Sequence, residues 1–269
     1  MEEATKIEIV DGVTFELRPN ARKPTNPEWV CLRKTRKVTD RYLALAPNFQ
    51  GCRMVEVGVD QGGSTSFFLK RYRPQGLLAI ELSSKPVPEL MSFLAKHDPQ
   101  QHVSVHWGVD QADDTEVPRL VSGIFGDQAL DLVIDDASHS LIPTTKTFEL
   151  LFPHLREDGL YIIEDWSTDH KFERQLDLEE RNNPDGKLAR AISAARAGPN
   201  FKPDYSIPMS LLACQLLIAS GRNPDWVKEV RCFQGYCEIK RGNAHIESGT
   251  PISSYIGEFG CWMFDKGPS

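Results

Sequence analysis

Residues 54–72 read MVEVGVDQGGSTSFFLKRY, and this stretch decides the fold. It opens with a short apolar run that predicts a buried strand, and SFFLKRY at its end predicts a helix. Between them, the glycines at positions 58, 62 and 63 predict a tight turn, because glycine accepts backbone angles that other residues avoid. A strand, a Gly-rich turn and a helix in direct succession are typical of the start of a βαβ unit.

The same alternation continues through the middle of the chain. Further apolar runs predict four more strands, which are LLAIEL, HVSVHW, LDLVID and LYIIED. The segments between them have helical spacing and are VPELMSFLAKH, PRLVSGIF and TTKTFELLFPHL. Five strands separated by helices predict an α/β fold with a Rossmann-like, doubly wound and mainly parallel sheet. Downstream, WVKEVRCF and YCEIKRG, joined at Gly235, predict a C-terminal antiparallel strand pair.

The two ends of the chain differ from this pattern. KIEIV and VTFELR flank Asp11 and Gly12, which predicts an N-terminal β-hairpin, and a predicted helix follows and ends near Leu45. We expect this extension either to form an oligomer contact or a lid, or to pack on its own domain. The predicted parts are a hairpin and helix extension at 1–45, an α/β domain at 46–241 with a variable substrate or lid insertion at 167–205, and a C-terminal tail at 242–269.

Composition and charge limit the classes of protein that this chain can be. It has 269 residues, 31 basic and 38 acidic side chains, and a net charge of −7, which argues against nucleic-acid binding. No apolar run approaches the ~18 residues that cross a bilayer, and the acidic N-terminus lacks the basic start of a signal peptide. The six cysteines form no C-x-x-C pair, which argues against zinc and favours reduced thiols. We therefore expect a cytoplasmic protein with neither nucleic-acid nor membrane partners.

The Gly-rich turn after the first predicted strand of the sheet is the first candidate binding site. Asp60 stands where the dinucleotide fingerprint has its second glycine, so a pyrophosphate fits poorly beside it. A ligand with an ammonium or sulfonium group fits better. Glu81 ends the next predicted strand, where such folds place a carboxylate against ribose hydroxyls. The structural alternative is a tight turn with solvated acidic side chains.

Acidic side chains follow two later strands at the point where each is predicted to end. The first group is Asp135-Asp136-Ala-Ser-His139, and the second is Glu164-Asp165-Trp166. If the two strands are neighbours, three of these carboxylates converge and need a cation, and Mg²⁺ prefers carboxylate oxygens. His139 then becomes a candidate general base.

Each group also has a structural explanation. Asp136 or Ser138 could cap the following helix, and His139 could be a solvated loop residue. Asp110 and Gln111 could hold an adenine edge, or their segment could cap a helix. Two strand-end acidic groups together with a histidine favour the binding-site interpretation.

The motifs VEVGVDQGGST, GVDQADD, DLVIDDASH and LFPHLREDGLYIIEDW, within residues 51–166, together resemble a known family. They are similar to class I S-adenosylmethionine-dependent methyltransferases of the rhamnosyl O-methyltransferase group. That group includes proteins labelled cephalosporin hydroxylase and is related to the metal-dependent macrolide sugar O-methyltransferases. The resemblance implies Mg²⁺ held by Asp136, Glu164 and Asp165, with His139 as the base. From their place in the sequence, Trp166 and His170 could line a substrate mouth, although core packing is the favoured explanation for Trp166. It implies contacts to S-adenosylmethionine from Glu56, Gly58, Asp60, Gly62, Gly63, Ser64, Glu81, Asp110, Gln111 and Asp135.

The function expected from the motifs and the resemblance is magnesium-dependent methyl transfer from S-adenosylmethionine to a rhamnose-like sugar hydroxyl. The acceptor would be a glycosylated natural product or a nucleotide-sugar, and the enzyme a homo-oligomer. A vicinal diol or catechol acceptor remains an alternative. A nicotinamide-dependent oxidoreductase is disfavoured by Asp60, and a non-catalytic binding protein by the presence of the acidic groups and His139. An oxygen-dependent hydroxylase would need two histidines and one carboxylate as iron ligands, and His139 is the one histidine that the sequence places in a suitable site.

Overall fold

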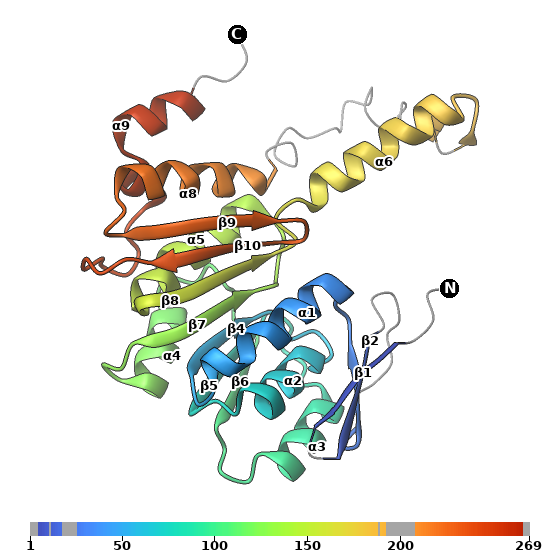
Figure 1. Cartoon of the computed structure of the whole chain (residues 1–269), viewed down its shortest axis with the longest axis vertical. Helices are drawn as coiled ribbons and strands as arrows, with labels where there is room; N and C mark the ends of the chain where they lie inside the picture. The colour runs from blue at the N-terminus through green and yellow to red at the C-terminus, as the bar shows by residue number, and fades with distance from the viewer. Residues whose placement is uncertain (1–4, 11, 18–25, 188, 192–207, 266–269) are drawn as a thin grey trace.

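A seven-stranded sheet forms the centre of the molecule (Figure 1). The computed structural model describes residues 5–10, 12–17, 26–187, 189–191 and 208–265. The strand order in the sheet is β6-β5-β4-β7-β8-β10-β9. These strands are β4 (Arg53–Val57), β5 (Gly76–Glu81), β6 (Val103–Trp107), β7 (Leu130–Asp135), β8 (Leu155–Glu164), β9 (Val227–Phe233) and β10 (Tyr236–Arg241).

The sheet is mainly parallel, and its first strand lies at the centre. β4 pairs in parallel with both β5 and β7, and the chain then winds outward to β6 on one side and β8 on the other. β10 pairs antiparallel with β8, and β9 with β10. β4, β5 and β7 are buried along almost their whole length, which explains their nearly continuous apolar runs. The expected doubly wound, Rossmann-like fold with a C-terminal antiparallel pair is confirmed.

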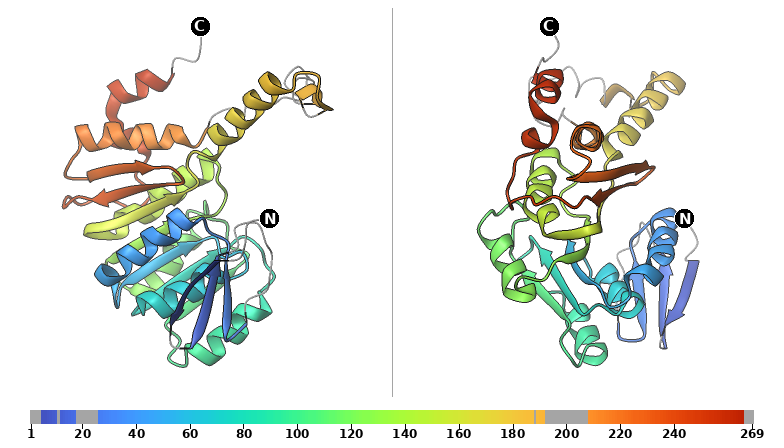
Figure 2. Two further views of the ribbon diagram at one scale, coloured as in Figure 1. Left: turned by 45° about the vertical axis from the view of Figure 1, so that its right-hand side comes forward. Right: turned by 60° about the vertical axis from the view of Figure 1, so that its left-hand side comes forward.

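Helices cover both faces of the sheet (Figure 2). On one face Val55 and Val57 of β4 pack with α4, α5, α8 and α9, and on the other Met54 packs with α1, α2 and α3. Within the described residues, every helix is too short or too polar to cross a lipid bilayer. The covering helices are α1 (Arg36–Leu45), α2 (Gly63–Tyr72), α3 (Pro88–His97), α4 (Glu116–Phe125), α5 (Leu141–Leu151), α8 (Ser210–Arg222) and α9 (Ile252–Asp265), with short 3-10 turns η1 (Ala46–Phe49) and η2 (Phe152–His154).

The N-terminal hairpin is present and is part of a small sheet of its own. β1 (Thr5–Val10) pairs antiparallel with β2 (Val13–Leu17), and Val10 faces Val13, while Asp11 lies outside the described residues. A third strand that the sequence did not predict, β3 (Trp29–Leu32), runs parallel to β2. The Phe15 ring meets the Phe67 ring of α2 edge to face, at 5.5 Å between centroids. These contacts place the small sheet against its own domain.

Helices also form in the segments that were expected as an insertion and as a C-terminal tail. Residues 168–182 of the polar insertion form the helix α6 (Thr168–Asn182), which extends away from the sheet (Figure 1). The expected tail at 242–269 contains α9, because Tyr255 and Ile256 are buried in the core beside α8. The apolar side chains of these two residues form a buried face of the helix, although the segment is rich in Gly and Ser.

Candidate active site

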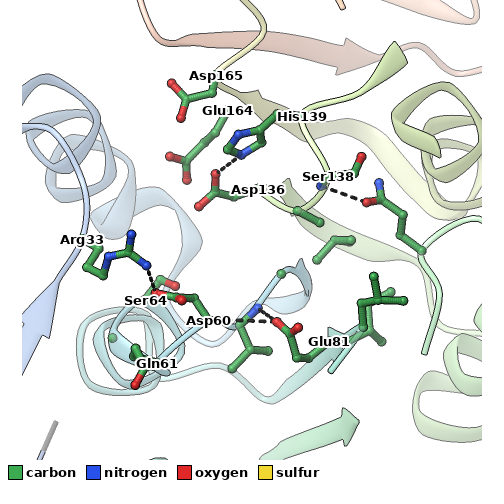
Figure 3. Close-up of a pocket in the computed structure, with 18 of the residues that line it drawn as sticks. Arg33, Asp60, Gln61, Ser64, Glu81, Asp136, Ser138, His139, Glu164 and Asp165 are labelled. Atoms are coloured by element: carbon green, nitrogen blue, oxygen red, sulfur yellow. Dashed lines mark hydrogen bonds and ion pairs between the residues drawn. The ribbon is translucent and has the colours of Figure 1, made fainter. Parts of the chain in front are cut away.

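A cavity of about 780 Å³ opens at the carboxyl ends of β4, β5, β7 and β8 (Figure 3). This is the edge of an open α/β sheet where ligands bind, and the volume suits a small-molecule ligand. Side chains or backbone from the expected site line it at Gly58, Asp60, Gly63, Ser64, Glu81, Asp110, Gln111, Asp136, His139, Glu164 and Asp165.

The Gly-rich turn forms one wall of the cavity. Gly58 has a φ of +92° and donates its N–H to the carbonyl of Ile80 at 2.9 Å. A Cβ at Gly58 would overlap the Asp136 carbonyl oxygen, and one at Gly63 would overlap the Cys31 carbonyl oxygen. Glycine at these two positions therefore lets the turn touch the loop after β7 and the end of β3.

The Glu81 carboxylate holds the turn from the neighbouring strand. Its Oε2 accepts hydrogen bonds from the backbone N–H groups of Val59 at 2.9 Å and Asp60 at 3.1 Å. Its Oε1 accepts from the N–H of Ser83 at 2.9 Å. The strand-end carboxylate thus supports the shape of the turn as well as lining the cavity.

Asp60 is not a bare carboxylate, as the sequence interpretation had assumed. Arg33, from the loop between β3 and α1, forms an ion pair with it (Figure 3). The guanidinium compensates the charge of Asp60, so charge alone no longer excludes a pyrophosphate from this turn.

The two acidic groups converge, because β7 and β8 are parallel neighbours with Asp135 opposite Ile163. His139 Nε2 lies 3.0 Å from Asp136 Oδ1. His139 and Asp165 both have a φ near +50°, an unusual conformation for residues with side chains, and the Asp165 N–H donates to Gly235 of the β9–β10 turn at 2.6 Å. Potential ligand atoms of Asp136, His139 and Asp165 lie within 4.8 Å of one another. Their two carboxylates and one imidazole fit a divalent cation.

Glu164 differs from its two acidic neighbours, because its Oε1 already has two donors. Lys34 Nζ donates to it at 2.6 Å, and the hydroxyl of Tyr42 also donates to it. Lys34 forms a second ion pair with Asp136. Glu164 and Lys34 are both buried, with side chains 4% and 8% exposed.

The electrostatic environment distinguishes the groups of this cluster. Burial raises the pKa of Glu164, and the nearby Asp136 adds to that rise. Burial also acts to raise the pKa of Asp136, but the Lys34 ammonium and His139 outweigh it and lower the pKa. The hydrogen bond to Asp136 raises the pKa of His139 above its ordinary value. The pair of His139 and Asp136 therefore favours a proton on the imidazole.

Three of the expected cofactor contacts do not line the cavity, namely Glu56, Gly62 and Asp135. Strand alternation places Glu56 under α2, 1% exposed, where burial raises its pKa to about 7. Gly62, with a φ of +76°, packs against Leu90. Asp135 points to the opposite face, where its Oδ2 accepts from the Tyr161 hydroxyl at 3.1 Å.

Trp166 and His170 are also outside the cavity lining. The Trp166 indole N–H donates to the carbonyl of Phe233 at 2.7 Å, and its ring packs against the core. His170 Nε2 lies 2.6 Å from Ser210 Oγ. For Trp166 the structural alternative, packing against the core, describes its position.

The remaining choices between a binding role and a helix-capping role concern the loops after β6 and β7. Gln111 lines the cavity and joins two loops, since its Oε1 accepts from Ser138 N at 3.0 Å and its Nε2 donates to Thr147 at 2.7 Å. Asp113 supports the start of α4, accepting from Glu116 N at 2.8 Å. Neither Asp136 nor Ser138 is the N-cap of α5, which is Ser140.

The sequence interpretation missed three residues that complete the site, which are Arg33, Lys34 and Tyr42. Arg33 and Lys34 come from the segment joining β3 to α1, and Tyr42 comes from α1 itself. Lys34 and Tyr42 are about 100 or more residues from the acidic groups that they bind. In the sequence, LRKTRK has the composition of a solvated basic run. Nothing in that run distinguishes Lys34, which is buried, from Lys37, which is exposed.

Comparison with known proteins agrees with this fold and these motifs. Residues 55–166 match the family model described as a methyltransferase domain. The chain is 31% identical over 167 residues, 56% of its length, to 8-demethyl-8-alpha-L-rhamnosyl tetracenomycin-C 2'-O-methyltransferase of Streptomyces olivaceus. It is 27% identical over 72% of its length to mycinamicin VI 2''-O-methyltransferase of Micromonospora griseorubida. The chain spans 40% and 51% of those two relatives, about half of their length.

Solved structures share the fold at low sequence identity. The MycE methyltransferase from the mycinamycin biosynthetic pathway, in complex with Mg and SAH, has a TM-score of 0.51 at 18% identity over 88% of this chain and 56% of MycE. A Staphylococcus aureus protein assigned as a caffeoyl-CoA O-methyltransferase has a TM-score of 0.51 at 17% identity, over 78% of this chain and 85% of its own. The resemblance to methyltransferases expected from the motifs is confirmed, because residues 55–166 match the methyltransferase-domain model.

Proposed function

We propose that this chain is an S-adenosylmethionine-dependent O-methyltransferase that acts on a sugar hydroxyl of a glycosylated small molecule. One observation carries the proposal. The His139–Asp136 pair and the acidic residues after β8 share a single cavity with the Gly-rich turn after β4. A base and a cofactor site therefore open onto the same space, as a group transfer between two bound molecules requires.

The wall formed by the Gly-rich turn is the proposed site of S-adenosylmethionine, which supplies an electrophilic methyl group when bound. Gly58 and Gly63 let this turn pack closely against the loop after β7 and the end of β3, and both line the cavity. Glu81 lines the cavity beside the turn, in the position where related folds contact ribose. The Arg33–Asp60 ion pair offers opposite charges to the zwitterionic amino-acid part of such a ligand.

At the other end of the cavity, His139 is the proposed general base. Asp136 orients its imidazole through Nε2, at 3.0 Å, and favours the imidazolium that forms when the base takes the hydroxyl proton. Asp136 and Asp165, whose ligand atoms converge, are the proposed main holders of a divalent cation such as Mg²⁺, and Glu164, bonded to Lys34 and Tyr42, lies beside them. A bound cation lowers the pKa of a hydroxyl that it contacts and so makes proton removal easier.

Two features of the relatives support the sugar acceptor. The Streptomyces olivaceus relative is named for a rhamnosyl substrate, and the Micromonospora griseorubida relative is named for mycinamicin VI. Both names specify O-methylation at a primed position of the substrate.

A methyl-transfer assay tests the proposal. Methyl-labelled S-adenosylmethionine is incubated with the protein, Mg²⁺ and either a panel of rhamnosides or a panel of catechols. We expect label in a rhamnoside, and label only in catechols would overturn the sugar acceptor. We expect EDTA to abolish transfer and excess Mg²⁺ to restore it, whereas full activity in EDTA would contradict the cation site.

Substitution of the proposed base tests its role. We expect His139→Gln to lower kcat by roughly 10²- to 10⁴-fold while binding S-adenosylmethionine normally, because it removes the imidazole that accepts the proton. The matched control is His102→Gln. His102 Nδ1 is also paired with an aspartate, Asp98 Oδ1 at 3.2 Å, but lies outside this cavity, so its loss should leave kcat unchanged. Wild-type turnover by His139→Gln would exclude His139 as the base.

A further inference from the structure

Lys34 is a buried cation that the proposed reaction does not use. It lies between β3 and α1, is 8% exposed, and donates to Asp136 and Glu164. These partners follow β7 and end β8, so one ammonium joins the ends of two strands of the central sheet. Burial of a lysine is costly unless its charge is paired, and here both partners are carboxylates.

The position of Lys34 changes the acidic cluster in two ways. It contributes one positive charge beside the three negative charges of Asp136, Glu164 and Asp165. With Tyr42, it also occupies Oε1 of Glu164. The group of potential ligand atoms that converge within 4.8 Å contains Asp136, His139 and Asp165 but not Glu164. Lys34 and Tyr42 thus hold Glu164 beside the place where the other ligand atoms meet.

We propose that Lys34 is a resident counter-ion of this cluster. It holds Asp136 and Glu164 together when no divalent cation is bound, and it weakens the binding of that cation by like-charge repulsion. The second half rests on the proposed function, since it assumes that the cluster binds a divalent cation. Repulsion between a buried ammonium and a divalent ion that share the partly buried Asp136 carboxylate is less screened by water and salt than repulsion at the surface.

Lys171 provides a matched control on the same cluster. Its Nζ lies 3.7 Å from Asp165 Oδ1, but its side chain and that of Asp165 are each 39% exposed. An exposed pair is well screened and contributes little. Removal of Lys171 therefore deletes one nearby positive charge without deleting a buried counter-ion.

The experiment measures the binding of Mn²⁺ by wild-type protein, Lys34→Met and Lys171→Met, using the electron paramagnetic resonance signal of free Mn²⁺. We expect Lys34→Met to bind Mn²⁺ at least tenfold more tightly than wild type, and Lys171→Met to match wild type. In EDTA, we expect Lys34→Met to melt at a lower temperature than wild type and to recover when Mn²⁺ is added.

Equal or weaker binding of Mn²⁺ by a folded Lys34→Met would overturn the inference while leaving the proposed function intact. Absence of Mn²⁺ binding by both wild type and Lys34→Met would instead contradict the cation site of the proposed function. An unchanged melting temperature of Lys34→Met in EDTA would overturn the counter-ion role directly.

A double variant covers the case in which Lys34→Met does not fold in either buffer. Lys34→Met with Glu164→Gln removes one positive and one negative charge, so the remaining cluster regains its original charge. We expect this double variant to fold in EDTA and to melt above the single variant. A double variant that is no more stable than Lys34→Met would overturn the inference, because the cost would then not come from the unpaired carboxylate.

Discussion

Gly58 is restricted both by its backbone conformation and by a close neighbour. Its φ is +92°, and a Cβ would overlap the Asp136 carbonyl oxygen. We expect Gly58→Ala to lower the free energy of unfolding by roughly 1–3 kcal/mol, and to weaken binding of S-adenosylmethionine, because the turn must move away from the loop after β7. Urea unfolding and ligand titration measure the two effects.

Gly123 in α4 is the control for this substitution. It has no atom within 4 Å of an added Cβ and a normal helical backbone. Gly123→Ala should stabilise the protein by up to ~1 kcal/mol, because alanine favours helix. Equal effects of the two substitutions would contradict the structural role given to Gly58.

The residues of the site divide by how they could be predicted. Asp136, His139, Glu164 and Asp165 were predictable, because parallel strands end at one edge of a sheet and these residues follow such ends. Lys34 was not, because its place depends on how a separate segment packs, and that segment has no periodic signal. Asp135 was predicted only in part. Its motif correctly marked the end of a strand at the cavity, but the alternation of side chains along β7 turns Asp135 away from the cavity and toward Tyr161.

At the scale of elements, α9 joins the C-terminal residues to the core. Tyr255 is 0% exposed and its ring lies 5.1 Å from that of Trp226 and 5.8 Å from that of Phe148, centroid to centroid. We expect Tyr255→Ala to cost about 3–5 kcal/mol of stability, through lost burial and the cavity left behind. Thermal and urea unfolding measure this cost.

Leu217 on α8 gives the comparison for Tyr255. It is 50% exposed, so Leu217→Ala should change stability by less than about 0.5 kcal/mol. If Tyr255→Ala were equally mild, α9 would be a loosely attached tail, as its composition had suggested.

Helices and strands with a clear pattern of apolar residues were predicted, and those without one were missed. The five parallel strands were all predicted, since β4, β5 and β7 have nearly continuous buried runs and the sequence of β6 alternates between apolar and polar residues. β3 has only four residues after a Pro- and Asn-rich stretch, and it was missed because its pairing with β2 decides its conformation. α9 was missed because glycines and serines interrupt its apolar positions.

At the scale of the whole molecule, α1 ties the N-terminal segment to the far side of the sheet. Arg41 forms a two-pronged ion pair with Glu238 of β10, which is 4% exposed, while Arg41 is 29% exposed. Arg41→Met leaves that carboxylate buried and unpaired. We expect a loss of about 2–3 kcal/mol in the free energy of unfolding, moderated by the partial exposure of Arg41.

Arg36 on the same helix is the control. Its pair with Asp40 is exposed, at 60% and 52%, so Arg36→Met should change stability by less than ~0.5 kcal/mol. An Arg41→Met variant as stable as Arg36→Met would show that α1 is not held through Glu238. Since α1 and the loop before it carry Tyr42, Lys34 and Arg33, the same attachment positions part of the site.

Calorimetric titration with S-adenosylmethionine, with NAD⁺ as the parallel ligand, tests the central claim most directly. The Arg33–Asp60 ion pair weakens the charge argument against NAD⁺, so the two ligands are compared directly. We expect one saturable site for S-adenosylmethionine and no binding of NAD⁺. Binding of NAD⁺ alone, or of neither ligand, would contradict the assignment of the cavity to a methyl donor.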